Sequence, residues 1–508
     1  MRVATSPATD RAALARGVLA AFAIAQLALL CLIVANHWRF PLFLETMEGT
    51  ILQQVRRAAQ WRHVFPEPAP DYVPLAYNPL LYYVSAPFAA LFGASLAGVR
   101  LVAIAGLALT VWLVHAIVRD ETGKPWLALV AAGLFAAAYK VMDAYLDTAH
   151  ADSWLIASIL LGSRLLARGG SMRRDAAGIA ILCAAFWFKQ PGALFAASGL
   201  AFVIWRRGLR ASWPAVAVAL VAGPLLYVVA GPALFGSHFH YFTWQVPSSW
   251  STLSLRALAG YAWFLIATYP VLLAVASLWL ADQLWRAPAA LSIWQAQLVT
   301  AIAAGALATL SPGSAANVFA PAGALLIIAG TIALAQALPD FDNPRRQSQG
   351  ALAAAALALS FVPLLYDPRP LLVDRAGAEA AYRDLASLIG ELGGPTASPS
   401  LGQLPSGPRL TPAGCWVALD DMIRGRRVPK RSPALFDAAL APALLPGPRF
   451  LLMNEPLADN AVFEALRPRY RLARDLGDRF RALAGLPGAY PVRSSWPRYV
   501  YERVRDGG

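Results

Sequence analysis

Residues 17–36 have the sequence GVLAAFAIAQLALLCLIVAN, a run that contains no charged side chain. A helix of about 20 apolar residues crosses the ~30 Å hydrocarbon core of a bilayer. Within that core the backbone polar groups must be satisfied internally, and a helix does so within one segment. Arg2, Arg11 and Arg16 precede the run, and we see no clear small-residue cleavage site after it. The run therefore predicts a retained first membrane span that also acts as the targeting signal.

Composition extends this interpretation to most of the chain. Of the 508 residues, 58% are hydrophobic and 14% are charged, and the mean hydropathy is +0.51. A soluble domain with this balance would expose too much apolar surface, so the excess must face lipid. A transmembrane barrel would instead show short alternating segments. We expect a polytopic α-helical membrane protein with about eleven transmembrane helices, at 17–36, 97–118, 126–140, 151–167, 175–188, 191–205, 212–235, 257–281, 291–310, 316–337 and 350–366.

The net charge of +14 comes mostly from arginine. Arginines at the ends of apolar runs are typical of orientation signals and lipid headgroup contacts. No polar face interleaves basic and aromatic residues, so we expect no nucleic-acid partner. A cytoplasmic N-terminus places the clusters at 164–174 and 206–210 inside, as positively charged residues prefer. We therefore expect a multi-pass protein of the inner (plasma) membrane, in which the stretch 75–93 is interfacial or re-entrant.

After Tyr366 the composition changes. Residues 367–508 contain most of the aspartates and glutamates, many prolines and glycines, and no run long enough to span a bilayer. The run Arg449–Met453 predicts a strand, and Glu379–Glu391 predicts an amphipathic helix. We expect a transmembrane domain at 1–366 and a small C-terminal α/β domain at 367–508. An odd number of spans places the second domain outside the cytoplasm.

The first external loop, residues 37–96, begins with two carboxylates in the sequence ETMEG (Glu45–Gly49). Glu45 and Glu48 are three residues apart and would share one face of a helix. A partly desolvated carboxylate at the membrane surface could act as a general base toward an acceptor hydroxyl. Alternatively, the two residues simply begin an interfacial helix, where acidic side chains suit the helix dipole.

The second external loop, residues 141–150, and its flank are rich in ionisable residues for so apolar a chain. Three carboxylates and a histidine fall within ten positions: Asp143, Asp147, His150 and Asp152. They could bind a divalent metal through oxygen ligands or orient the hydroxyl groups of a sugar. The alternative is a solvated loop in which Asp152 or Ser153 caps the next helix.

Lys189 and Gln190 interrupt apolar sequence between two expected spans. A cation near the hydrocarbon core costs about 2.5–3.5 kcal/mol on insertion scales and is usually partnered. A phosphate is an obvious partner, although a lysine can also extend from a helix end to the interface. The chain has neither a Gly-rich phosphate loop after a strand nor a P-loop. These features favour a lipid-linked phosphate donor over a nucleotide.

In these loops the chain resembles the GT-C superfamily of membrane glycosyltransferases, which contains protein mannosyltransferases and an aminoarabinose transferase. The features that carry the resemblance occur in order along residues 17–366: Glu48-Gly49, Tyr77–Tyr83 (YNPLLYY), Phe92-Gly93, Arg100, Ala151-Asp152, Lys189-Gln190, and Gly313-Ser314 followed by Asn317. Family members often have Asp-Glu-Gly in the first loop, whereas this chain has Met47-Glu48-Gly49.

The resemblance implies an inverting hexosyl- or pentosyltransferase. Such an enzyme moves a sugar from a polyprenyl-phosphate donor to a glycan, lipid or protein acceptor outside the cytoplasm. It implies that the catalytic base is Glu48, with Glu45 as the nearby option. The other roles that it implies are donor-phosphate binding by Lys189, Gln190 and Arg256, substrate contacts from Tyr77, Asn78, Tyr82 and Asn317, and an acidic second-loop cluster at Asp143, Asp147, His150 and Asp152. Metal dependence varies across the superfamily, so a divalent metal is a possible cofactor.

Two other classes compete with this interpretation. A lipid or glycan transporter or flippase would carry polar residues at mid-membrane depth and an internal repeat. The charged residues here instead gather at the ends of spans, and no repeat is visible. A non-catalytic assembly protein would use its external tail to recognise a partner, and substitutions at Glu48 and Lys189 would then leave it functional.

Overall fold

The computed structural model describes residues 7–93, 95–311, 314–337, 347–399, 404, 409–424, 445, 447–459, 462–486 and 496–504. Within these residues, four helical segments are long and apolar enough to cross a membrane, or up to six if each of two bent helix pairs counts as one span. The four are Ala13–His37, Leu96–Thr122, Trp213–Phe235 and Ala316–Ala337. The chain is thus a helical multi-pass membrane protein. The total of about eleven spans stays a prediction.

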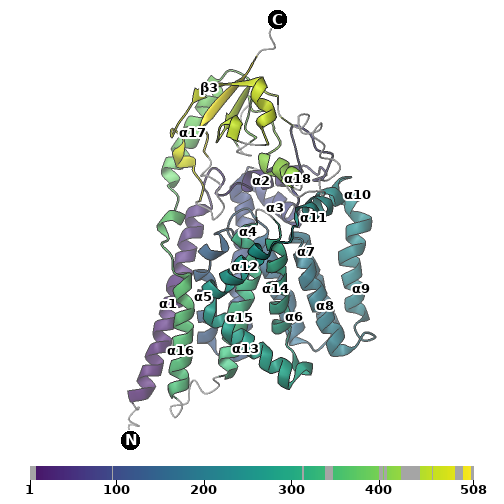
Figure 1. The fold of residues 1–508 in the computed structure, drawn as a ribbon, viewed down its shortest axis with the longest axis vertical. Helices are drawn as coiled ribbons and strands as arrows, with labels where there is room; N and C mark the ends of the chain where they lie inside the picture. The colour runs from purple at the N-terminus through teal and green to yellow at the C-terminus, as the bar shows by residue number, and fades with distance from the viewer. Residues whose placement is uncertain are drawn as a thin grey trace.

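Most of the long helices run side by side in one bundle (Figure 1). Its members are α1 (Pro7–His37), α4 (Leu96–Thr122), α5 (Pro125–Ala137), α6 (Asp152–Arg168), α7 (Met172–Phe188), α8 (Gly192–Arg207), α9 (Trp213–Leu220), α14 (Ile293–Thr309), α15 (Ala320–Ala337) and α16 (Gln347–Phe361). Helix α15 is buried along almost its whole length, with Leu326, Ile327 and Ile328 at 0% exposure. It therefore forms the centre of the bundle.

The span expected at 257–281 is not one continuous helix. Two helices occupy this stretch, α12 (Leu255–Thr268) and α13 (Pro270–Arg286), and their axes differ by 102°. Pro270 stands at the start of α13, and Tyr269 before it has left the helical conformation, with φ −128° and ψ 43°. Proline cannot donate the helical hydrogen bond and disfavours α geometry in the preceding residue. Hydropathy alone does not register this break.

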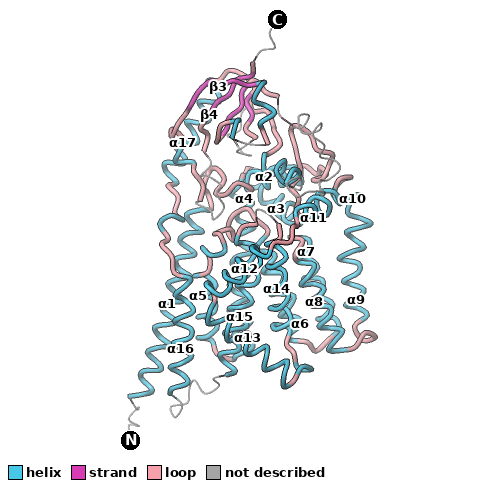
Figure 2. The backbone as a smooth tube through the Cα atoms, in the orientation of Figure 1, coloured by secondary structure: helices cyan, strands magenta, loops and turns pink. Residues whose placement is uncertain are grey.

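One end of the bundle carries the non-spanning structure (Figure 1). The helices there are α2 (Glu48–Ala59), α3 (Leu80–Leu91), α10 (Gly231–Phe235), α11 (Val246–Trp250), α17 (Arg375–Glu391) and α18 (Trp416–Arg424). The strands, drawn in magenta in Figure 2, are β1 (Thr396–Ala397), β2 (Phe450–Met453), β3 (Tyr470–Asp475) and β4 (Tyr499–Arg503). The strand expected at Arg449–Met453 and the helix expected at Glu379–Glu391 are confirmed as β2 and part of α17.

The four strands form one sheet in the order β1-β2-β4-β3. Strand β2 runs parallel to β1 and antiparallel to β4, and β3 also pairs antiparallel with β4. The side chains of β2 are all buried, as expected for a strand covered on both faces. The division of the chain into two domains at residue 366 stays a prediction.

The C-terminal residues pack directly on the first loop. The Leu486 amide donates to the Leu44 carbonyl over 2.7 Å, and the Gly414 amide donates to the Pro70 carbonyl over 2.9 Å. The Gln53 side chain donates to the Ala413 carbonyl over 2.9 Å. Leu44 immediately precedes Glu45, so the sheet region is attached next to the first candidate site residue.

Candidate active site

Arg100, on α4, donates hydrogen bonds to several residues at the start of the first loop. Its side chain is fully buried. Its Nη1 donates to the Phe40 carbonyl over 2.7 Å, and its Nη2 donates to the Leu42 carbonyl over the same distance. Its Nε and Nη2 also donate to the two carboxylate oxygens of Glu48, over 2.8 and 2.6 Å. Such a bidentate pair fixes geometry as well as charge.

Glu48, the first residue of α2, has contacts on both carboxylate oxygens besides Arg100. The Leu44 amide donates to Oε2 over 2.6 Å, and the Ala149 amide donates to Oε1 over 2.8 Å. Burial alone would raise the pKa of Glu48, but the charge and hydrogen bonds of Arg100 outweigh burial, and the pKa is lowered. Glu48 is thus a buried, ionised anchor that joins α4 to the first and second loops.

Glu45 has a different setting from Glu48. Its carboxylate lies at the edge of the buried region, with 6% of the side chain exposed, and accepts a 2.6 Å hydrogen bond from His150 Nε2. The ring of His150 stacks on Tyr145, with centroids 4.9 Å apart. Burial lowers the pKa of His150, but the carboxylates of Glu45 and Asp152 raise it more, so the net shift is upward. Glu45 and His150 form a close contact between the first and second loops.

Asp152, at the start of α6, joins this pair to the cation between α7 and α8. Lys189 Nζ lies 2.7 Å from Asp152 Oδ1, and Asn317 Nδ2 donates to Oδ2 over 3.1 Å. His150 Nδ1 lies 3.8 Å from Oδ2. Lys189 also lies near the face of Tyr77, with Nζ 5.9 Å from the ring centroid. Residues spread over 270 positions, from Glu45 to Asn317, therefore form one polar cluster.

The cluster borders a small cavity. Its lining residues are Ile51, Tyr77, Asn78, Leu81, Tyr82, His150, Ala151, Asp152, Phe188 and Lys189. The cavity volume is about 20 Å³, which has room for a single water molecule. A sugar phosphate is larger than this space and would fit only if the lining side chains moved.

The remaining residues predicted from the sequence lie in different surroundings. Asn78 and Gln190 tie loops together, because their amide groups donate to the carbonyls of Phe186 and Ala76 over 2.5 and 2.8 Å. The buried hydroxyl of Tyr82 has no hydrogen-bond partner among the described residues. Arg256 is exposed in the first turn of α12 and does not line the cavity. Gly313 lies outside the described residues.

Asp143 holds the loop before Asn317. Asp143 and Ala144 both have left-handed backbone conformations, with φ 61° and 56°, which is costly for residues other than glycine. The carboxylate of Asp143 accepts a 3.3 Å hydrogen bond from the Asn317 amide. Burial raises the pKa of Asp143 to about 6, although backbone hydrogen bonds from Ala316 and Asn317 oppose the rise. Asp143 thus links the second loop to the residue that contacts Asp152.

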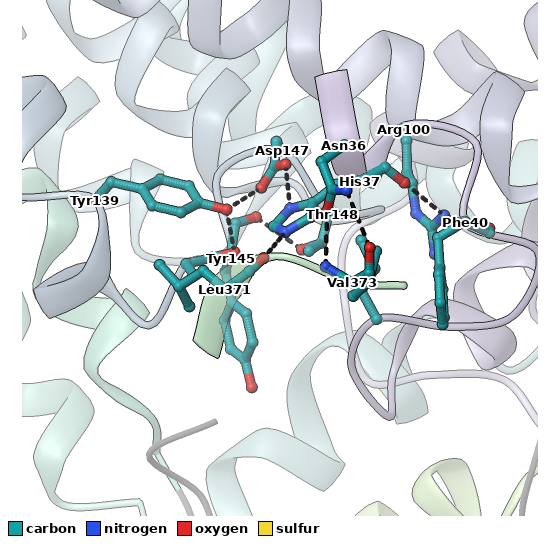
Figure 3. Close-up of polar contacts among 12 residues, drawn as sticks. Asn36, His37, Phe40, Arg100, Tyr139, Tyr145, Asp147, Thr148, Leu371 and Val373 are labelled. Carbon is teal, nitrogen blue, oxygen red and sulfur yellow. Dashed lines mark hydrogen bonds and ion pairs between the residues drawn. The ribbon is translucent and has the colours of Figure 1, made fainter. Parts of the chain in front are cut away.

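Asp147 belongs to a separate buried network (Figure 3). His37 Nδ1 donates to Asp147 over 2.8 Å, and His37 Nε2 donates to the Leu371 carbonyl over 2.6 Å. Tyr139 donates its hydroxyl hydrogen to the other oxygen of Asp147 over 2.5 Å. Oxygen atoms therefore face both ring nitrogens of His37.

Sequence reasoning did not single out His37 or Tyr139. Their only signal was position, because His37 ends the first span and Tyr139 ends the apolar stretch before the second loop. Among the described residues, no group of three or more His, Cys, Asp or Glu side chains is arranged to hold a metal ion.

Comparisons with known proteins concern the fold and part of the sequence. The family model for dolichyl-phosphate-mannose-protein mannosyltransferase matches residues 73–230, which include Asp152 and Lys189. A search of curated proteins gives no match. The crystal structure of ArnT from Cupriavidus metallidurans bound to undecaprenyl phosphate is 16% identical, with a TM-score of 0.52, and the match covers 96% of this chain and 98% of that one. The apo structure of the same ArnT gives 16% identity and a TM-score of 0.50, over 96% and 97% of the two chains. The chain therefore has the fold of ArnT, and its resemblance to the GT-C membrane glycosyltransferases is confirmed.

Proposed function

We propose that this protein is an inverting glycosyltransferase that moves a sugar from a polyprenyl-phosphate donor to an acceptor outside the cytoplasm. The observation that carries the proposal is the continuous polar cluster of Glu45, His150, Asp152 and Lys189. Within the cluster, Asp152, Lys189 and His150 line one cavity, and His150 joins Glu45 to them. Activation of a hydroxyl requires a base such as a carboxylate, and stabilisation of a leaving phosphate requires a cation. The fold of ArnT, whose structure contains undecaprenyl phosphate, supports a lipid phosphate as the donor.

Glu45 is the better candidate for the base. Both carboxylates lie in ion pairs, Glu48 with Arg100 and Glu45 with His150. Glu48 has no exposed surface, and Arg100 and two backbone amides occupy both of its oxygens, so an incoming proton would have to displace one of these donors. Glu45 instead contacts His150 and the Met47 amide and retains some exposure. Since the resemblance places the base at Glu48, this choice follows from the geometry and not from the motif.

In the proposed step, the acceptor hydroxyl gives its proton to Glu45 while its oxygen attacks the anomeric carbon. The bond between that carbon and the phosphate oxygen breaks, and its electron pair leaves with the polyprenyl phosphate. The ammonium group of Lys189, which has three N–H donors, leaves Asp152 and binds the departing phosphate. His150, held cationic by Glu45 and Asp152, orients the base.

The finer architecture belongs to the same proposal. We place the N-terminus in the cytoplasm, the cluster and residues 367–508 on the opposite side, and the chain in the inner membrane with about eleven spans. The attachment of the C-terminal residues to the first loop beside Glu45 supports their shared side. The transmembrane part would then hold the donor, and the C-terminal part would face the acceptor.

The test is a transfer assay with purified protein in lipid nanodiscs and radiolabelled polyprenyl-phosphate sugars. We expect wild-type protein to release label from the lipid, and we expect Glu45→Gln and Lys189→Ala to slow release at least 100-fold. The matched control is Glu67→Gln, the same chemical change at an exposed residue of the same loop. A folded wild-type protein that consumes none of the donors would overturn the proposal. Full activity of Glu45→Gln would overturn the assignment of Glu45 as the base.

A further inference from the structure

A second cavity lies in the C-terminal residues, far along the chain from the cluster around Asp152. Its volume is about 350 Å³, and its lining residues are Asn454, Glu455, Pro456, Asp459, Trp496, Arg498 and Tyr499. Pockets for small organic ligands begin at about 300 Å³. This space is therefore large enough for one or two sugar rings.

The position of the cavity follows from the sheet. Asn454 directly follows β2, which pairs parallel with β1, and Tyr499 begins the neighbouring strand β4. The carboxyl end of β2 and the beginning of the antiparallel strand β4 lie at the same edge of this mixed sheet, with Met453 opposite Tyr499. There the backbone turns away from the sheet and leaves space between successive loops.

Arg498 contributes hydrogen-bond donors to the lining of the cavity. Its guanidinium stacks on the ring of Trp496, 5.0 Å from the centroid. Its nearest carboxylate contact is a long one, 3.8 Å from Nη2 to Asp478. Its Nε is buried and has no hydrogen-bond partner among the described residues. The Arg498 side chain as a whole is 38% exposed, so its outer N–H groups can donate to a ligand oxygen in the cavity.

The lining chemistry selects the ligand class. An apolar ligand would strip water from Glu455, Asp459 and Arg498 without replacing it. A phosphate would face two carboxylates and be repelled. A neutral polyhydroxyl compound can donate to the carboxylates and accept from Arg498, while its C–H face packs on the ring of Tyr499 or Trp496.

We propose that this cavity binds a carbohydrate, which is the acceptor glycan of the transfer reaction or a sugar next to its reactive hydroxyl. The role of this carbohydrate as acceptor rests on the proposed function. The binding of a saccharide in the cavity does not depend on it. The C-terminal residues contact Leu44 beside Glu45, and the sheet lies at the same end of the molecule as α2 (Figure 1). A glycan held in the cavity would thus be anchored on the side where the base lies.

The experiment measures binding of fluorescently labelled di- to tetrasaccharides of glucose, mannose, galactose, rhamnose and arabinose to the full chain in nanodiscs, without donor lipid. We expect at least one saccharide to bind, and we expect Glu455→Gln, Asp459→Asn and Trp496→Ala each to weaken binding at least tenfold. Glu391→Gln is the matched control, because Glu391 is exposed on α17 and outside the cavity. Thermal unfolding of each variant identifies any that fails to fold, and the two isosteric changes keep the test valid if Trp496→Ala does so.

Three outcomes would overturn the inference: no saccharide binds, the cavity variants bind like wild type, or inorganic phosphate binds and is lost with Arg498→Ala. Donor consumption is measured on the same preparation. Saccharide binding without consumption of any donor would overturn the proposed transferase activity but would support the carbohydrate site. Donor consumption without saccharide binding would do the reverse.

Discussion

At the scale of single residues, the pair Glu48–Arg100 defines what the first-loop motif does. Removing one partner of a fully buried ion pair leaves the other charge without compensation and costs about 3–5 kcal/mol. We expect Glu48→Gln and Arg100→Met each to lower the melting temperature strongly, whereas Glu45→Gln should lower activity with little change in melting temperature. Thermal unfolding in nanodiscs, together with single-turnover transfer, separates the two effects. Equal melting temperatures for Glu48→Gln and wild type would contradict the anchor role.

The pair Glu45–His150 makes a prediction about pH. The pKa of His150 is raised above 6.5, because burial, which lowers it, is outweighed by Glu45 and Asp152. A raised histidine pKa contributes stability that is fully present below pH ~6.5 and is lost as pH rises through the folded-state value. We therefore expect stability to decline on the alkaline side of neutrality, and we expect His150→Gln to remove that dependence. Melting temperatures from pH 6 to 9 would test this, and an unchanged slope in the variant would contradict it.

The sequence could name these residues but could not assign their roles. Glu45 and Glu48 are equivalent by spacing, and what distinguishes them is Arg100, 52 positions beyond Glu48, and a backbone amide in the second loop. The sequence predicts Asp152 as part of the ionisable second-loop cluster and Lys189 as a cation that interrupts apolar sequence, and the two lie in contact. No local pattern links His37 to Leu371, since that contact spans 334 positions.

At the scale of elements, the turn between α7 and α8 positions Lys189. A Cβ added at Gly192 would lie 2.2 Å from the Ala185 carbonyl carbon and from the Phe186 amide nitrogen, so the backbone would have to move. Overpacking of this kind costs about 1–3 kcal/mol. We expect Gly192→Ala to lower the melting temperature and to reduce transfer by displacing Lys189. Gly260→Ala on α12, where nothing lies within 4 Å, should behave like wild type in both measurements.

Hydropathy predicts where the helices lie but does not predict where a helix is interrupted. Runs of apolar residues predicted the helices at 97–118 and 316–337 because lipid and core impose the same composition along a straight helix. The same composition continues through Tyr269 and Pro270, where the axis turns by 102°. The direction of a chain after a proline depends on what packs against it, and no single-sequence pattern records that packing.

At the scale of the whole molecule, the prediction concerns sidedness. The proposed orientation puts Glu67 and Glu391 outside and Arg210 inside. We expect cysteines introduced at positions 67 and 391 to react with a membrane-impermeant maleimide in intact cells, and a cysteine at position 210 to react only after permeabilisation. All three residues are exposed, so accessibility differs only by side. Reaction of positions 67 and 210 from the same side would contradict the proposed topology.

The contact between Lys189 and Asp152 has a consequence for how substrate affinity is set. In the resting protein the ammonium already has a counter-ion, 2.7 Å away, so an arriving phosphate must exchange for a carboxylate and does not fill an empty site. In the proposed mechanism, the affinity for the donor is therefore the difference between two ion pairings, and the return of Lys189 to Asp152 favours release of the product lipid. Asp152→Asn removes the carboxylate that competes with the phosphate for Lys189. We expect this variant to bind the product polyprenyl phosphate more tightly and to release it more slowly at the end of each catalytic cycle.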